Sequence, residues 1–119
     1  MSLQEFNYEV IDNILIIKVA GELSVFNQKS FDDFLNEHVI KRRSFIFDLS
    51  EITHINSMCI GHIIRKSRAI RAFIVEGDNG LVSKVLSLLN VDKTIPVCKT
   101  LDEAFHRIGD LYAEENKNS

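Results

Sequence analysis

The sequence is poor in several residue types, and each shortage argues against a class of protein. Its 119 residues include one proline, two cysteines and no tryptophan. Cys59 and Cys98 form neither a CxxC pair nor a cluster with metal-ligand spacing, so neither a disulfide framework nor a zinc module is predicted. The longest purely aliphatic run covers residues 14–17. A membrane helix needs roughly 18 apolar residues, so no membrane segment is expected.

The sequence also lacks a large excess of charge of either sign. The 14 basic and 17 acidic residues give a net charge of −3 and are spread along the chain. Nucleic acids and anionic lipids attract proteins with a basic surface, so neither is an expected partner. No cleavable apolar leader follows Met1, and the cysteines do not indicate disulfides. The sequence therefore predicts a cytoplasmic protein.

Motifs that bind nucleotides or carry catalysis are missing as well. The sequence has no GxxxxGK[ST] loop and no GxGxxG after its first predicted strand. A nucleophile elbow needs glycine two residues before its serine, but Ile55 stands two residues before Ser57. We therefore expect no enzyme, no catalytic residue and no cofactor.

What the sequence does contain is typical of one soluble domain. Hydrophobic residues make up 45% of the chain and charged residues 26%, close to the average for globular proteins. No repeat, low-complexity tract or Pro/Gly-rich linker divides it. We predict one domain over residues 1–113, followed by a frayed polar tail over residues 114–119.

The first third of the chain predicts a hairpin followed by a helix. Apolar and β-branched residues dominate residues 6–11 and 14–20. The intervening Asp12 and Asn13 tolerate the positive φ of a tight turn. After Gly21, with Ser24 or Asn27 as cap, helical spacing places four apolar residues on one stripe, namely Phe31, Phe34, Leu35 and Val39.

The rest of the chain alternates strand and helix signals. Strands are predicted over residues 44–50, 72–75 and 94–98. The helices between them begin at Asn56 and after residues 77–80, and Thr100 with Glu103 forms a capping box for the last one. Their apolar stripes contain Ile60, Ile63 and Ile64, then Leu81, Val82, Val85, Leu86 and Leu89. We therefore predict an α/β fold with a mixed, mainly parallel sheet, an N-terminal antiparallel hairpin and about four helices.

Two polar clusters suggest chemistry that we weigh and set aside. His54, Cys59 and His62 lie within nine residues, but a metal site would need further ligands brought in by folding. No metal site is therefore expected. Asp48 at the end of a predicted buried strand could belong to a receiver-like phosphoaspartate protein. Only Glu22 lies near the end of the first predicted parallel strand, so this third alternative lacks magnesium ligands.

Ser57 is the most informative position. Its hydroxyl falls in the first turn of a predicted helix, where free N–H groups and the helix dipole tolerate a phosphate. Phosphorylation would add about −1.5 to −2 charges and could disrupt a partner packed over Met58 and Ile60. A serine in this place is more often simply a capping residue, and the sequence leaves both interpretations open.

The segment FIFDLSEITHINSMCIGHIIRKSRA, residues 45–69, resembles the central motif of STAS domains of the anti-sigma factor antagonist type. Residues 19–23, 89–93 and 101–105 are similar to further family segments and follow in the family's order. The resemblance implies a STAS-like fold and a non-enzymatic, phosphorylation-controlled switch. The unphosphorylated form would sequester an anti-sigma factor and free a sigma factor for transcription.

The resemblance also implies the partners and the site. The anti-sigma factor would be an ATP-binding serine kinase, and a phosphatase would restore the active form. The family pattern Asp-Ser-Ser/Thr-Gly-Leu-Gly falls on residues 56–61, which makes Ser57 the candidate phosphoacceptor. The implied partner surface is the segment before this helix and the start of the helix, containing His54, Asn56, Ser57, Met58, Cys59, Ile60 and Gly61.

Three positions depart from that pattern. Asn56 lacks the carboxylate, Met58 lacks a second hydroxyl, and Cys59 adds a side chain where the family has glycine. These departures motivate an alternative, a non-switching STAS scaffold or a ligand or redox sensor. A cysteine in the first turn of a helix can have a depressed pKa, although an inert buried thiol is the more ordinary outcome. The oligomeric state and the identity of the partners are left open.

Overall fold

The computed structural model describes residues 7–23, 28–39, 44–68 and 71–117. They contain a five-stranded sheet whose strands stand in chain order, β1-β2-β3-β4-β5. The strands are β1 (Asn7–Ile11), β2 (Ile14–Leu23), β3 (Ser44–Ile55), β4 (Arg71–Val75) and β5 (Val97–Cys98). β1 pairs with β2 antiparallel, and the remaining pairs are parallel. The mixed, mainly parallel sheet is therefore confirmed, with β3 at its centre.

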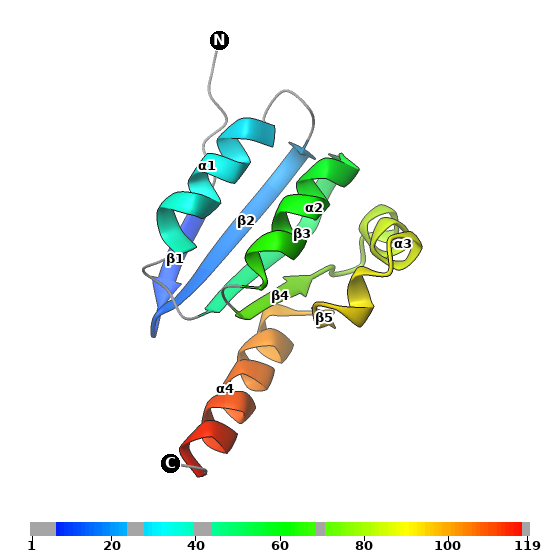
Figure 1. Cartoon of the computed structure of the whole chain (residues 1–119). Helices are drawn as coiled ribbons and strands as arrows, with labels where there is room; N and C mark the ends of the chain where they lie inside the picture. The colour runs from blue at the N-terminus through cyan, green and yellow to red at the C-terminus, as the bar shows by residue number, and fades with distance from the viewer. Residues whose placement is uncertain (1–6, 24–27, 40–43, 69–70, 118–119) are drawn as a thin grey trace.

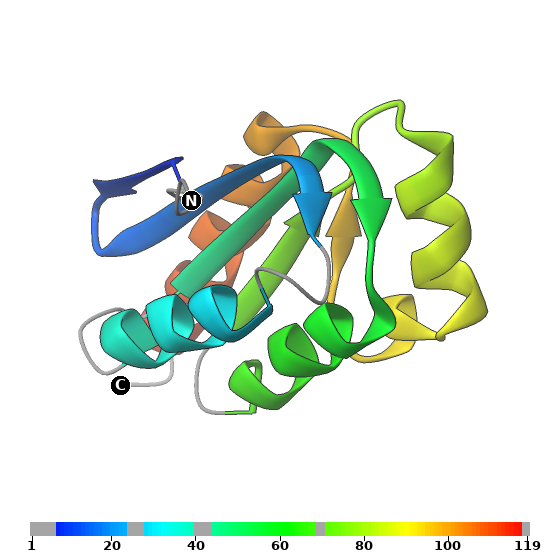
Figure 2. The same ribbon diagram turned by 90° about the horizontal axis from the view of Figure 1, so that it is seen from above.

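Helices cover the two faces of the sheet unequally. They are α1 (Gln28–Val39), α2 (Ser57–Lys66), α3 (Gly80–Leu88), the 3-10 helix η1 (Val91–Lys93) and α4 (Leu101–Lys117). Crossovers between parallel strands are right-handed, so a sheet that grows in one direction places its crossover helices on one face. α1 and α2 lie on that face and α4 lies on the other (Figure 1 and Figure 2). None of the described helices is both long and apolar enough to cross a membrane.

The core follows the alternation of side chains along the strands. On the α1 and α2 face, β2 and β3 bury aliphatic and aromatic side chains against Phe31 and Leu35 of α1. On the opposite face, Ile46 and Phe73 pack against Ala104 and Ile108 of α4. The cluster under α1 and α2 is the larger one, and α3 also contributes to it.

The hairpin forms as predicted. Asp12 and Asn13 have φ values of 51° and 68°, the left-handed conformation that a two-residue turn of this kind requires. Ser24 and Asn27, the predicted caps of the first helix, lie outside the described residues. Phe31 and Leu35 of its predicted stripe are fully buried.

Several boundaries differ from the predictions. β3 continues to Ile55 instead of ending at Ser50, and β5 covers two residues because η1 and a turn occupy the chain before it. α4 extends through Lys117, so residues 114–117 are helical although we predicted a frayed tail.

Details of two helices also differ. In α3, Leu81 is 42% exposed, and Leu89 just beyond the helix is 43% exposed, so only part of the predicted apolar stripe is buried. At the start of α4, Thr100 Oγ1 accepts the Glu103 N–H as in a capping box. The Glu103 carboxylate accepts the N–H of Lys99 instead of that of Thr100.

Candidate functional site

The candidate site lies where β3 passes into α2. Asn56 has an extended backbone, and its side-chain Oδ1 accepts the Met58 N–H at 2.7 Å, which confirms Asn56 as the N-cap. The Asn56 N–H donates to the Leu23 carbonyl at 2.7 Å. This bond ties the start of α2 to the end of β2. Asn56 therefore holds the first turn of α2 through its side chain and anchors it to β2 through its backbone N–H.

Ser57 and Met58 project from that fixed turn toward solvent. Ser57 is the first residue of α2 and is exposed, and Met58 is 57% exposed. No acidic residue occupies the first turn. His54 is also exposed, and its Nδ1 lies 3.3 Å from the Thr53 hydroxyl. Within residues 54–58, the exposed side chains thus include an imidazole, a hydroxyl and a flexible apolar thioether.

Cys59 and Ile60 lie on the other side of the helix. Both are 0% exposed and belong to the core between α2 and the sheet. The expectation that a partner packs over Ile60 is therefore wrong, because that side chain is not at the surface. Of residues 58–60, only Met58 presents an exposed apolar side chain.

Gly61, the last position of the predicted motif, is partly exposed. A Cβ at this position would meet only the Arg65 guanidinium, at an ordinary contact distance of 3.6 Å. Packing within the fold therefore leaves room for a side chain at Gly61.

The Cys59 thiol has the opposite chemistry from that of a redox sensor. Burial raises its pKa from 9.0 to about 11. A redox-sensing cysteine needs a thiolate and access to oxidant. The inert buried thiol is the interpretation that the structure favours, and the redox part of the alternative function loses its basis.

The last part of β3, residues 50–55, leads into the candidate site and is held in place by Asn79, the N-cap of α3. Asn79 Nδ2 donates to the Ser50 carbonyl at 3.1 Å and to the Ile52 carbonyl at 2.7 Å. Its Oδ1 caps α3 by accepting the N–H groups of Leu81 and Val82. Sequence analysis missed this role, because capping by Asn79 has a sequence signature but its bonds to a distant strand do not.

Gly77 allows the close approach of these two segments. It has a φ of 59°, and a Cβ there would lie 2.8 Å from the Ser50 Cβ. The turn after β4 can therefore pack directly against β3 only because the residue is glycine.

His62, one of the two histidines weighed as metal ligands, contacts side chains of α1 and α2. His62 Nδ1 lies 3.3 Å from Asp32 Oδ1 of α1 and also contacts the Arg65 guanidinium. Lys66 approaches Asp32 to 3.8 Å, so this cluster joins α2 to α1. Among the residues that the structure describes, no three His, Cys, Asp or Glu side chains are grouped closely enough to hold a metal ion.

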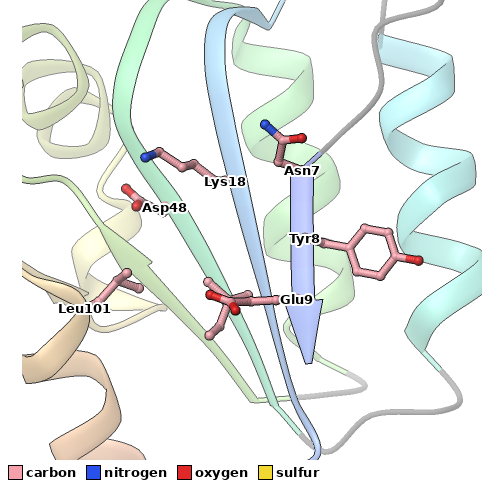
Figure 3. A pocket seen from close by; sticks show the side chains of 7 residues that line it. Asn7, Tyr8, Glu9, Lys18, Asp48 and Leu101 are labelled. Carbon is pink, nitrogen blue, oxygen red and sulfur yellow. The ribbon is translucent and has the colours of Figure 1, made fainter. Parts of the chain in front are cut away.

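Asp48 lies away from α2. It is on the sheet face that α4 occupies (Figure 3) and is 6% exposed. Its Oδ1 accepts the Ser50 N–H at 3.1 Å and the Ser50 hydroxyl at 2.7 Å. Asp48 pairs with Val75 at the last position of the β3–β4 ladder, while β3 itself continues to Ile55, so the expected strand end and loop are part of a longer strand. The described part of the chain supplies no acidic cluster for the magnesium of a receiver-like site.

Comparison with known proteins gives the family. The model of the STAS domain family matches residues 5–104. A Thermotoga maritima protein with the provisional name anti-sigma factor antagonist is 29% identical over 112 residues, covering 87% of this chain and 96% of that protein. Its curated name describes that protein and not the present one.

Solved structures agree in fold. The anti-sigma factor antagonist SpoIIAA in its unphosphorylated form superposes with a TM-score of 0.76 at 16% identity, covering 89% of this chain and 97% of that chain. The Bacillus SpoIIAA in its phosphorylated form gives a TM-score of 0.67 at 15% identity, covering 87% and 99%. The family match over residues 5–104 and the shared architecture show that this chain belongs to the STAS domain family.

Proposed function

We propose that the protein is an anti-sigma factor antagonist that binds its partner through the start of α2 and is switched by phosphorylation of Ser57. The observation that carries this proposal is the exposed Ser57 hydroxyl at the first position of a rigidly capped helix, beside the exposed Met58. The provisional name of the Thermotoga relative supports the partner class. Asn56 and His54 extend the proposed surface on the strand side.

The physics of the site suits a phosphate that alters binding without unfolding the domain. The N-terminus of a helix carries free N–H groups and partial positive charge, which favour an anion. The first turn of α2 contains no acidic side chain that would repel the phosphate. A phosphate on Ser57 would add about −1.5 to −2 charges next to Met58, and a partner that covers Met58 would have to desolvate that charge.

The proposed partner is an anti-sigma factor of the ATP-binding serine kinase type, and a phosphatase would reverse the modification. An unmodified domain would sequester this partner and free a sigma factor for transcription. In this proposal the kinase and phosphatase activities belong to the partners, and this chain acts by binding. The proposed binding surface is open at His54, Ser57 and Met58.

The test compares two baits, Ser57→Ala and Ser57→Asp, in affinity capture from lysate of the source cells. The alanine bait should retain an anti-sigma factor, identified by mass spectrometry, and the aspartate bait should lose it. Ser87→Asp, the same change at an exposed serine of α3, is the control and should retain the partner. Equal capture by both Ser57 variants, each shown to be folded by circular dichroism, would refute the switch.

The phosphoacceptor itself needs a separate measurement. The captured partner, incubated with ATP and magnesium, should add one phosphate to the wild-type chain and none to Ser57→Ala, as judged by intact mass. A phosphate that appears on the Ser57→Ala chain would assign the modification to another residue.

A second candidate function is a STAS scaffold that binds its partner without phosphorylation. The uncharged Asn56 cap and the absence of a hydroxyl at Met58 favour it, because both remove groups that the family motif places beside the serine. Intact mass of the protein from its source cells, in growth and in stress, distinguishes the two. A chain that is never phosphorylated but still captures an anti-sigma factor would support the scaffold.

A further inference from the structure

The side chain of Met58 combines exposure with an oxidisable sulfur atom. It projects from the first turn of α2 and is 57% exposed. Among the large apolar side chains of the described residues, only that of Leu88 is more exposed. A thioether is oxidised to a sulfoxide without first losing a proton, whereas a thiol reacts as its thiolate. Burial and a raised pKa, which make the Cys59 thiol inert, therefore do not protect Met58.

The other sulfur atoms of the described residues are shielded from solvent. Cys59 is 0% exposed and Cys98 is 1% exposed. Burial also raises the pKa of the Cys59 thiol to about 11, so little thiolate forms near neutral pH. Met1, the other methionine of the sequence, lies outside the described residues. Within the described part of the chain, Met58 is therefore the residue whose sulfur an oxidant reaches.

The backbone of this turn is held without help from the Met58 side chain. The Met58 N–H donates to Asn56 Oδ1 at 2.7 Å, and the Cys59 N–H donates to the Asn56 carbonyl at 3.0 Å. Cys59 and Ile60 anchor the same turn in the core between α2 and the sheet. A change confined to the Met58 sulfur therefore alters the surface of the turn and leaves its packing intact.

Oxidation changes what a partner has to bury at this surface. A thioether is apolar, and its removal from water on binding is favourable. A sulfoxide oxygen is polar, and it loses its bonds to water when a partner covers it. An acceptor buried without a donor weakens binding by about tenfold or more. Unlike a phosphate, the sulfoxide adds no net charge, so it acts through desolvation alone.

We propose that Met58 is a redox modification site, and that its oxidation to methionine sulfoxide releases the anti-sigma factor whether or not Ser57 is phosphorylated. This inference rests on the proposed function. The oxidant is a peroxide: the sulfur lone pair attacks one peroxide oxygen, an S–O bond forms and the O–O bond breaks. Sulfur is oxidised by two electrons, and hydrogen peroxide is reduced to water. Methionine sulfoxide reductases reverse the change.

The test uses the Ser57→Ala chain, which has no hydroxyl for a phosphate at this position, and the purified anti-sigma factor that this bait captures. The chain is treated with hydrogen peroxide, and catalase removes the excess before the partner is added. Peptide mapping by mass spectrometry should find one added oxygen on Met58. In calorimetric titration the oxidised chain should bind about tenfold more weakly or worse. Methionine sulfoxide reductases A and B should restore the affinity.

Matched variants in the same Ser57→Ala background assign the effect to one atom. Met58→Leu keeps an apolar side chain of similar volume, so its affinity should stay within a few-fold and should not respond to peroxide. This variant retains Met1, Cys59 and Cys98 and thus controls for their oxidation. Met58→Gln, which is polar and cannot be oxidised, should bind weakly without treatment. Leu88→Gln, the same kind of change at an exposed residue of α3, should leave the affinity unchanged.

Three outcomes would overturn the redox site. One is an oxidised Ser57→Ala chain that binds as tightly as the untreated chain. Another is an equal loss of affinity in the Met58→Leu variant, which would place the sensitive atom elsewhere. The third is oxidation of Met1 under conditions that leave Met58 unmodified.

The untreated chain tests the proposed function separately. If the untreated Ser57→Ala chain captures no anti-sigma factor, the proposed function fails before any oxidant is added, and the redox site fails with it. Capture that survives oxidation of Met58 refutes the redox site alone. Circular dichroism of each treated chain confirms that a loss of binding is not a loss of fold.

Discussion

The Cys59 thiol lies in the core beneath α2, and burial raises its pKa from 9.0 to about 11. The folded state therefore keeps its proton at a pH where the unfolded state has lost it. The free energy of unfolding must fall as pH rises through this window, because the unfolded state then binds fewer protons. Between pH 8 and pH 10.5 we expect a loss of about 2 kcal/mol from this residue.

Urea denaturation at pH 8 and at pH 10.5 measures this loss. The Cys59→Ala variant should lose less stability between the two pH values than the wild type does, since alanine cannot ionise. Ile63→Ala removes apolar atoms from the same helix without removing an ionisable group, so it should keep the wild-type pH dependence. Identical pH dependence for wild type and Cys59→Ala would contradict the raised pKa.

For single residues, the sequence predicted local hydrogen bonding, such as the Asn56 cap, better than it predicted which side chains are exposed. Asn56 was identifiable as a cap because a short polar side chain precedes a helical stripe. Ile60 was assigned both to the apolar stripe and to the partner surface, and the structure decides for the stripe. Helical spacing with Ile63 was the stronger signal, since residues three apart share a face.

At the scale of elements, the segment between Ser50 and Ile55 positions the proposed site. Gly77 lets the turn after β4 approach this segment, with a left-handed φ and no room for a Cβ beside Ser50. Gly77→Ala should lower the free energy of unfolding by about 2 kcal/mol, since both the backbone conformation and the contact are strained. It should also weaken partner capture through the start of α2.

Gly80 offers a matched control for that change. It begins α3, its φ is not in the left-handed region, and a Cβ there meets nothing within 4 Å. Gly80→Ala should therefore leave stability unchanged or raise it slightly. Chemical denaturation of both variants measures the difference. A Gly77→Ala variant as stable as Gly80→Ala would show that the turn relaxes without cost.

The length of β3 illustrates what local sequence signals omit. Residues 50–55 have apolar side chains only at Ile52 and Ile55, three positions apart. This spacing lacks the period of two that indicates a strand with one buried face, so the sequence alone predicts that the strand ends at Ser50. Pairing with β2 up to Leu23 and the bonds from Asn79 extend the strand. Both contacts join segments more than 25 residues apart, and a single sequence does not show them.

For the molecule as a whole, the alternation of strands and helices predicted the sheet but not the placement of α4. Strands β2 to β5 are laid down in one direction, so right-handed crossovers direct their helices to one face. α4 follows the last strand and is free of that rule. It covers the opposite face, because Ile46, Phe73 and Val75 there would otherwise be exposed.

This arrangement predicts unequal local stability on the two faces. The cluster under α1 and α2 joins several elements, whereas the smaller cluster under α4 relies on a single helix with Ala104 and Ile108 fully buried. Native-state hydrogen exchange should show α4 amides opening at a lower free energy than those of α2 and the central strands.

Two substitutions of buried isoleucines separate local from global opening. Ile63→Ala, on the other face, should cost about 3 kcal/mol of global stability and speed exchange of the slowest β3 amides, but it should leave α4 exchange nearly unchanged, because Ile63 stays buried when α4 alone opens. Ile108→Ala destabilises the native state relative to every state in which α4 is unfolded, including the globally unfolded state, so it should speed exchange in both α4 and β3. If Ile63→Ala speeds exchange equally in α4 and β3, the two faces unfold together and α4 is not a separate unit.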